Sequence, residues 1–191
     1  MNGKIQLRNG KYFSIDSALG EREGNEQVVG TSYTSLVDDV NAGDRLLLDD
    51  GNIVLEVKKV EGTTILTRVI VGGELSNSKG INKLGGGLSA EALTEKDHED
   101  IRFAAEIGAD YLGVSFVRHG ADVETARMLL RAAGSDAHVI SKIERREAID
   151  NMIEIVTASD AIMVARGDLG VEIGDAEVPA VQKSLISEAR N

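Results

Sequence analysis

The sequence contains no cysteine and no tryptophan, and it has one proline among its 191 residues. The absence of cysteine excludes disulfide bonds, thiolate nucleophiles, and zinc or iron–sulfur sites with cysteine ligands. Aromatic residues make up only 3% of the chain, so a surface that stacks nucleic-acid bases is not expected. No apolar run approaches the roughly 18 residues of a membrane helix, and the first five residues carry no signal-peptide core. We therefore expect a cytoplasmic protein.

Negative charge is in clear excess, with 32 Asp and Glu against 21 Lys and Arg, which gives a net charge of −11. Such a chain is repelled by nucleic-acid backbones and anionic membranes, so neither is expected as its main partner. Local basic pockets for small phosphorylated ligands stay compatible with this balance. Hydrophobic residues make up 42% of the chain, which excludes a disordered acidic tail and allows a packed core.

Residues 1–83 are predicted to form a small β domain without a helix of useful length. Asp50-Gly51 separates two apolar runs and suits a tight hairpin, because glycine tolerates positive φ. Residues 53–60 alternate between apolar and polar side chains, and a second hairpin is expected before the β-branched run 63–71. The pattern favours a barrel or sandwich of six or seven short strands.

The glycine-rich stretch at 72–93 is interpreted as a hinge, and after it helices alternate with apolar strands. Thr94 suits a helix N-cap, and the following helix is expected to end at Gly108. Three strand–helix units come next, a rhythm typical of a parallel sheet. In such folds, ligands bind at the carboxyl ends of the strands. The predicted strands are residues 111–117, 138–144 and 161–165.

Each of these strand ends carries polar residues. Ser115-Phe116 follows the first strand and by itself is an ordinary exposed segment. Lys142 and Glu144 end the second strand and, two residues apart, should project from the same face. They form either a structural ion pair or a functional one, with Glu144 as a Mg²⁺ ligand and Lys142 as a cation beside a developing anion.

The third strand end is Ala165-Arg166-Gly167-Asp168, followed by Leu169-Gly170. The glycines allow backbone N–H groups to approach an anion, and Asp168 could share a cation with Glu144. The alternative is a simple turn with a helix cap. Together, the strand ends suit phosphoryl transfer or enolate chemistry with a divalent metal, and not hydrolysis by a catalytic triad. The histidines are interpreted as solvated or capping residues: His98, His119 and His138.

Several of these motifs resemble those of one enzyme family. The ten residues 163–172, Met-Val-Ala-Arg-Gly-Asp-Leu-Gly-Val-Glu, are similar to the metal-binding strand end of the pyruvate kinases, and Lys142-Ile143-Glu144 is similar to their lysine-bearing strand. The resemblance implies an α/β fold, with a small β-barrel lid domain at 1–83 followed at 84–191 by strands four to six of a (β/α)8 TIM barrel. Further matches are Ser115-Phe116-Val117-Arg118, Leu93-Thr94-Glu95-Lys96-Asp97, Gly43-Asp44, Leu48-Asp49-Asp50-Gly51 and Ser78-Lys79-Gly80-Ile81-Asn82.

Pyruvate kinases of glycolysis transfer the phosphoryl group of phosphoenolpyruvate to ADP, giving pyruvate and ATP, and they use Mg²⁺ (or Mn²⁺) and K⁺. The resemblance implies that Lys142 is catalytic and that Lys79 contacts the nucleotide. It further implies that Glu144 and Asp168 ligate the divalent metal. The implied substrate-binding residues are Ser115, Phe116, Ala165, Arg166, Gly167 and Asp168.

The resemblance covers only part of a pyruvate kinase, because the sequence lacks the family's Asn-Phe-Ser-His segment, so the K⁺ ligands are expected outside this chain. The complete protein that contains this chain is expected to be a homotetramer. The isolated chain is expected to be inactive, and to self-associate or exchange segments with a second copy by domain swapping. Two alternatives stay open. One is a Mg²⁺-dependent aldolase or lyase that stabilises pyruvate enolate, against which the Lys79 motif argues, and the other is an inert structural fragment.

Overall fold

A computed structural model describes residues 3–20 and 23–190, which form two compact units, Met1–Ala90 and Glu91–Asn191. The sequence places the border near residue 83, whereas the structural border follows Ala90. The physical reason is that Leu88, 8% exposed, packs into the core of the first unit. The next residue is tied to the same unit, because the Ser89 N–H donates to Asp39 Oδ2 at 2.7 Å.

The first unit is built from short strands, as predicted, although it has eight of them among the described residues and one short helix, α1 (Leu36–Asp39), that the sequence pattern did not indicate. The predicted hinge also contains two of these strands, β7 (Glu74–Ser76) and β8 (Ile81–Lys83). Six strands form one sheet in the order β3-β2-β6-β5-β4-β8, and β1 pairs with β7. The strands are β1 (Lys4–Gln6), β2 (Tyr12–Asp16), β3 (Val28–Gly30), β4 (Arg45–Leu48), β5 (Ile53–Glu61), β6 (Thr64–Val71), β7 (Glu74–Ser76) and β8 (Ile81–Lys83).

Both predicted hairpins are confirmed. β4 and β5 pair antiparallel, and the turn between them holds Asp49, Asp50 and Gly51 at φ values of 52°, 55° and 84°. The left-handed turn matches the twist of the flanking strands, which explains the Asp-Gly sequence. β5 then pairs antiparallel with β6. Alternate residues of these strands fill the core, with Leu55 and Ile65 fully buried.

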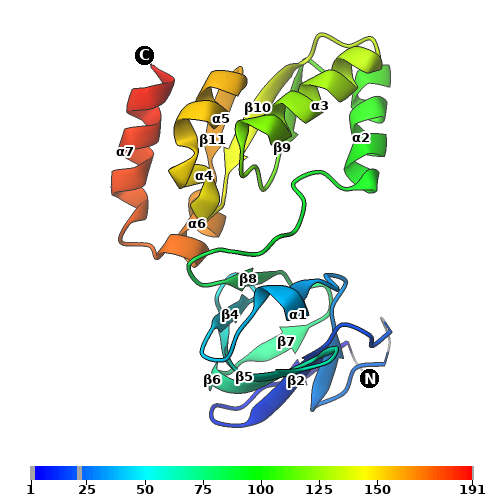
Figure 1. Ribbon diagram of the computed structural model, residues 1–191, viewed down its shortest axis with the longest axis vertical. Helices are drawn as coiled ribbons and strands as arrows, with labels where there is room; N and C mark the ends of the chain where they lie inside the picture. Colours follow the sequence, from blue (N-terminus) through cyan, green and yellow to red (C-terminus); the bar gives the residue numbers. More distant parts are fainter. Residues whose placement is uncertain (1–2, 21–22, 191) are drawn as a thin grey trace. The chain divides into compact units, whose positions relative to one another are not determined.

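The second unit contains the three predicted strand–helix units, and its strands form a parallel sheet in the order β11-β10-β9 (Figure 1). The strands are β9 (Tyr111–Val114), β10 (His138–Ile143) and β11 (Ala161–Val164). The helices are α2 (Glu95–Glu106), α3 (Gly120–Ala132), α4 (Arg146–Asp150), α5 (Met152–Ala158), α6 (Arg166–Ile173) and α7 (Val178–Ala189).

Two local predictions in this unit are wrong. The first strand stops at Val114 instead of residue 117, because the backbone turns at Phe116, where φ is +55°. The apolar spacing of Ile149, Met152 and Val156 predicts one helix, but the structure divides it at Asn151 into α4 and α5. The segment after Ala165, whose glycines suggest an anion-binding turn, forms the helix α6.

The parallel sheet buries one face against helices and leaves the other face open within this unit. Val114, Val139 and Ile143 belong to the core that the helices cover, and Figure 1 shows α3, α5 and α7 alongside the strands. On the other face, Tyr111 is 61% exposed and Met163 is 49% exposed. Parallel sheets normally have both faces covered, so an exposed face of this kind is unusual for a parallel sheet.

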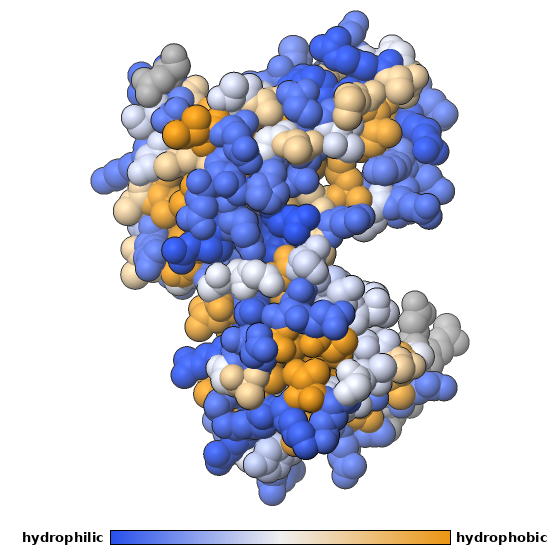
Figure 2. Space-filling view, viewed as in Figure 1, coloured by the Kyte–Doolittle hydropathy of each residue, from blue (hydrophilic) through white to orange (hydrophobic). Residues whose placement is uncertain are grey.

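No helix in the described ranges 3–20 and 23–190 combines the length and the apolar composition needed to cross a membrane. Hydrophilic side chains cover much of the face shown in Figure 2, with smaller apolar areas between them.

Asp160 joins three elements at the amino-terminal edge of the parallel sheet. Its Oδ2 accepts hydrogen bonds from the Val139 N–H at 2.7 Å and from Arg127 Nη1 at 2.8 Å, and Arg127 Nη2 donates to the Ala158 carbonyl at 2.6 Å. The Val139 N–H is the main cause that holds the pKa of Asp160 below its ordinary value of 3.8, and Arg127 adds to this effect while partial burial opposes it.

Replacing Asp160 by Ala is expected to lower the free energy of unfolding by about 2 kcal/mol at neutral pH, because charge-assisted hydrogen bonds are lost. Since the folded pKa is depressed, the contribution is present above the ordinary pKa and is lost as the pH falls through the lowered folded value. Urea denaturation from pH 7 downward measures this difference. Asp150→Ala, at an exposed site, is the control, and an Asp160→Ala effect that persisted unchanged in strong acid would contradict the prediction.

Candidate active site

The carboxyl end of β10 places Lys142 and Glu144 together, as their spacing predicts. Lys142 Nζ lies 2.5 Å from Glu144 Oε1 and donates to Ser115 Oγ at 2.8 Å. The Glu144 side chain is 1% exposed, and that of Lys142 is 29% exposed. A buried carboxylate is costly unless it is paired and hydrogen-bonded. The Glu144 carboxylate therefore needs a counter-charge, and the Lys142 ammonium supplies it.

The second oxygen of Glu144 is fixed by the loop after β9. The Phe116 N–H donates to Glu144 Oε2 at 2.7 Å, and the left-handed backbone at Phe116 belongs to the turn that carries this N–H group. A positive φ is unusual for a bulky residue and is found most often where function requires it. Ser115 and Phe116, both predicted site residues, thus lie against the Lys142–Glu144 pair.

The third strand end continues directly into α6. The Ala165 N–H donates to the Ile143 carbonyl at 3.1 Å, which keeps this end beside β10. Arg166, Gly167 and Asp168 form the first turn of α6, where backbone N–H groups have no partner within the helix and favour an anion. A Cβ added at Gly167 would meet no atom within 4 Å, so the space beside this turn is open.

The donor set at this edge fits a divalent metal that prefers oxygen ligands. Glu144 and Asp168 are two carboxylates that follow neighbouring parallel strands, and a cation already lies against Glu144 Oε1 in the form of the Lys142 ammonium. The Asp168 carboxylate makes no hydrogen bond or ion pair within residues 3–20 and 23–190. No group of three or more His, Cys, Asp or Glu in these ranges could hold a metal. Two carboxylates with further oxygens from water or substrate suit Mg²⁺.

Lys79 is not in the unit that holds these residues. It belongs to the first unit, where its Nζ lies 2.6 Å from Asp49 Oδ1, and this contact raises the pKa of Lys79 above its ordinary value. Asp49 lies at the left-handed turn between β4 and β5. The ion pair therefore joins two segments that the sequence singled out separately.

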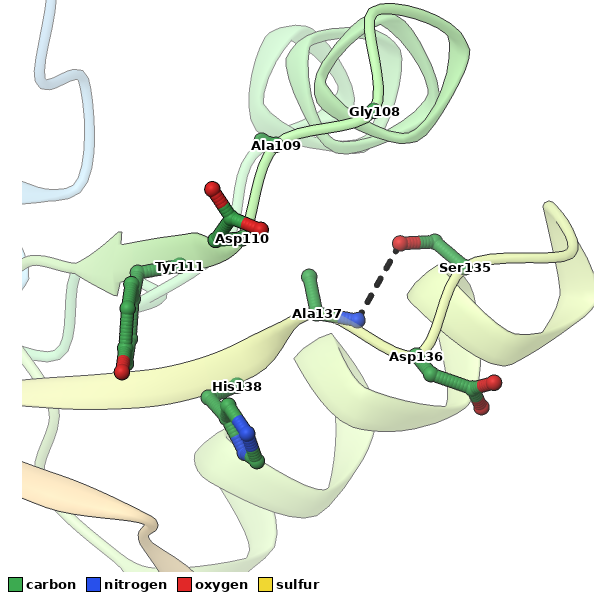
Figure 3. A pocket seen from close by; sticks show the side chains of 8 residues that line it. All are labelled: Gly108, Ala109, Asp110, Tyr111, Ser135, Asp136, Ala137 and His138. Carbon is green, nitrogen blue, oxygen red and sulfur yellow. Dashed lines mark hydrogen bonds between the residues drawn. The ribbon is translucent and has the colours of Figure 1, made fainter.

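A hollow of about 550 Å³ lies at the opposite, amino-terminal edge of the sheet. Its lining does not resemble an active site. In Figure 3 the carboxylates of Asp110 and Asp136 point in different directions, and the Ser135 hydroxyl accepts a hydrogen bond from the Ala137 N–H. The His138 ring lies 5.5 Å from the Tyr111 ring. Because its polar groups do not converge, this hollow offers no catalytic arrangement.

Sequence reasoning missed two buried charged residues beside the carboxyl edge, Arg145 and Glu172, which are 4% and 2% exposed. Glu172 Oε2 accepts the Arg146 N–H at 2.8 Å, and Glu172 Oε1 lies 3.8 Å from Arg145 Nε. The available signal was the spacing of four residues between Asp168 and Glu172, which places both on one face of a helix.

Comparison with known proteins explains this arrangement. The family model "Pyruvate kinase, barrel domain" matches residues 1–191, the whole chain. The chain belongs to the pyruvate kinase family. Its α/β fold, with a β unit followed by three parallel strand–helix units, is therefore part of the pyruvate kinase barrel domain.

Individual pyruvate kinases agree with the family match. The chain is 56% identical over 191 residues to pyruvate kinase II of Salmonella typhimurium, covering 98% of this chain and 40% of that protein. It is 54% identical over 192 residues to the pyruvate kinase of Haemophilus influenzae, covering 99% of this chain and 40% of that protein. It is 48% identical over 177 residues to the pyruvate kinase of Mycobacterium tuberculosis, covering 93% and 38%. The chain thus spans about two fifths of the length of these relatives.

Proposed function

We propose that the complete protein containing this chain transfers the phosphoryl group of phosphoenolpyruvate to ADP, giving pyruvate and ATP. The observation that carries this proposal is the buried Lys142–Glu144 pair at the carboxyl end of β10, with Ser115 and the Phe116 N–H against it. The pair concentrates a fixed cation and a hard oxygen ligand at one point. This combination suits phosphoryl transfer, because its transition state spreads negative charge over oxygens.

Each proposed role follows from the placement of a side chain. Lys142 donates to Ser115 in the structure and reorients toward the transferring phosphoryl and the enolate oxygen, where its charge stabilises the developing anion. Ser115 and Phe116 border the substrate. The backbone of Ala165, Arg166 and Gly167 binds the substrate carboxylate at the open first turn of α6.

A divalent metal is proposed on Glu144 and Asp168, and Mg²⁺ or Mn²⁺ bound there supplies Lewis-acid charge for phosphoryl and enolate oxygens. Glu144 is prepared for this role, because the Phe116 N–H fixes one of its oxygens. Potassium is proposed as a second cation, held by residues outside this chain. Lys79 of the first unit is proposed to contact ADP. We place the complete protein in cytoplasmic glycolysis, as a homotetramer.

The proposal is tested by a coupled assay of the complete protein with phosphoenolpyruvate, ADP, Mg²⁺ and K⁺. Pyruvate is expected to appear only when ADP and a divalent metal are both present, and its amount should equal that of the ATP formed. The 191-residue chain is expected to give no turnover under the same conditions. Pyruvate formation that did not depend on ADP would replace this proposal by an enolate lyase or a phosphatase.

A further inference from the structure

A buried cluster of charged residues lies directly beside the proposed metal site. Arg145 follows Glu144 in the chain, and its Nε lies 3.8 Å from Glu172 Oε1 and 3.5 Å from Glu147 Oε2. The Arg145 and Glu172 side chains are at least 95% buried. Burying an arginine and a glutamate is costly, and such pairs do not in general add stability over apolar residues. Their presence here calls for a reason beyond packing.

Glu172 also holds the backbone at the junction between β10 and α4. Its Oε2 accepts the N–H of Arg146, the first residue of α4, at 2.8 Å. This N–H is one of those that a helix cannot satisfy internally. Through these two contacts, α6 is fixed to the segment that begins one residue after Glu144, and α4 and α6 contact each other.

Asp168 lies one helical turn before Glu172 on α6. Residues four apart on a helix share a face, so a contact that fixes the direction of Glu172 also fixes the rotation of α6 that directs Asp168. Glu144 and Arg145 are consecutive on one side of this contact, and Asp168 and Glu172 are one turn apart on the other. The two proposed metal ligands are thus each attached to a member of the buried cluster.

We infer that Glu172, with Arg145 as its counter-charge, is a positioning residue that sets the geometry of Asp168 relative to Glu144. It touches neither the substrate nor the metal and acts through α6. This inference rests on the proposed function for its catalytic meaning, although the effect on the metal can be measured without turnover. Residues that orient metal ligands without touching the metal typically change metal affinity by about 10- to 100-fold when they are mutated.

The test measures Mn²⁺ binding to the complete protein without substrates. The concentration of free Mn²⁺ is read from its electron paramagnetic resonance signal. Glu172→Ala removes both the charge and the acceptor and should weaken Mn²⁺ binding by about 10- to 100-fold. Glu172→Gln keeps an acceptor for the Arg146 N–H and is expected to give a smaller loss. Arg145→Lys keeps the charge but loses the Nε contact with Glu172, so a loss smaller than that of Glu172→Ala is expected. Glu177→Gln, an equal charge change at an exposed site after α6, is the control.

Unfolding midpoints and kinetics separate positioning from plain stability. A positioning role raises the Mn²⁺ dissociation constant and the Mg²⁺ requirement of turnover at temperatures where the variants are fully folded. Glu172→Ala that bound Mn²⁺ like the unchanged protein, with only its unfolding midpoint lowered, would overturn the inference. So would a failure of both Glu172 variants to fold, because the cluster would then serve folding alone.

The proposed function and this inference fail separately. If the unchanged protein transferred no phosphoryl group from phosphoenolpyruvate to ADP while Glu172→Ala still weakened Mn²⁺ binding, the function would fall and the positioning role would stand. If turnover were normal and Mn²⁺ binding insensitive to Glu172, the reverse would hold.

Discussion

Replacing Lys142 by Met in the complete protein is expected to lower turnover about 10³-fold while divalent-metal binding persists. The lysine supplies a fixed positive charge where negative charge develops, and removing one such group typically costs about 10²–10³ in rate or more. The KM for phosphoenolpyruvate should change much less than turnover, because the interaction strengthens in the transition state. The coupled assay measures both constants.

The same substitution has a second expected effect that the geometry makes specific. Glu144 is buried and loses the cation 2.5 Å from its Oε1, so the metal-free protein should be destabilised by about 3 kcal/mol. Mg²⁺ should restore this loss, because a ligand that binds only the folded state stabilises it. Lys183→Met, at an exposed position of α7, is the matched control. Retained turnover in Lys142→Met would remove this residue from the mechanism.

The part of the site that the sequence predicted depends on strand geometry. Alternation along a strand placed Lys142 and Glu144 on one face, and the parallel rhythm placed the ends of β9, β10 and β11 at one edge; the structure confirms both. These inferences succeed because side-chain direction in a strand repeats every two residues. The roles of the residues came from the resemblance to pyruvate kinases, since no periodicity distinguishes a catalytic lysine from a structural one.

The part that the sequence did not predict depends on backbone conformation and helix phase. The positive φ at Phe116 has no compositional signal, because the segment contains no glycine or asparagine to suggest it. The glycines at 167 and 170 suggested a close backbone approach to an anion, yet Gly170 lies inside α6, where a Cβ would come within 2.5 Å of Asp175 Oδ1. Here glycine serves close packing within a helix. Because the sequence pattern did not indicate a helix over these residues, it did not show that Asp168 and Glu172 share a face.

Replacing Glu144 by Gln is expected to abolish tight divalent-metal binding and to lower turnover about 10³-fold, because the Lewis-acid charge is worth several kcal/mol in the transition state. Gln has nearly the size of Glu, so the packing around residue 144 should be preserved. It is neutral, however, and presents one oxygen where Glu144 presents two. The Phe116 N–H and the Lys142 ammonium both donate to Glu144, so either orientation of the amide leaves one donor facing another donor.

Metal dependence distinguishes this variant from Lys142→Met, although both collapse turnover. Glu144→Gln should require far more Mg²⁺ for half-maximal activity and should recover partly as Mg²⁺ is raised, whereas Lys142→Met should saturate at the ordinary concentration with a low maximum. Glu106→Gln, exposed at the end of α2, controls for the change of charge. An unchanged Mg²⁺ requirement in folded Glu144→Gln would mean that the carboxylate serves only to hold Lys142. The buried pair would then be an ion pair that orients the lysine, with the metal held elsewhere.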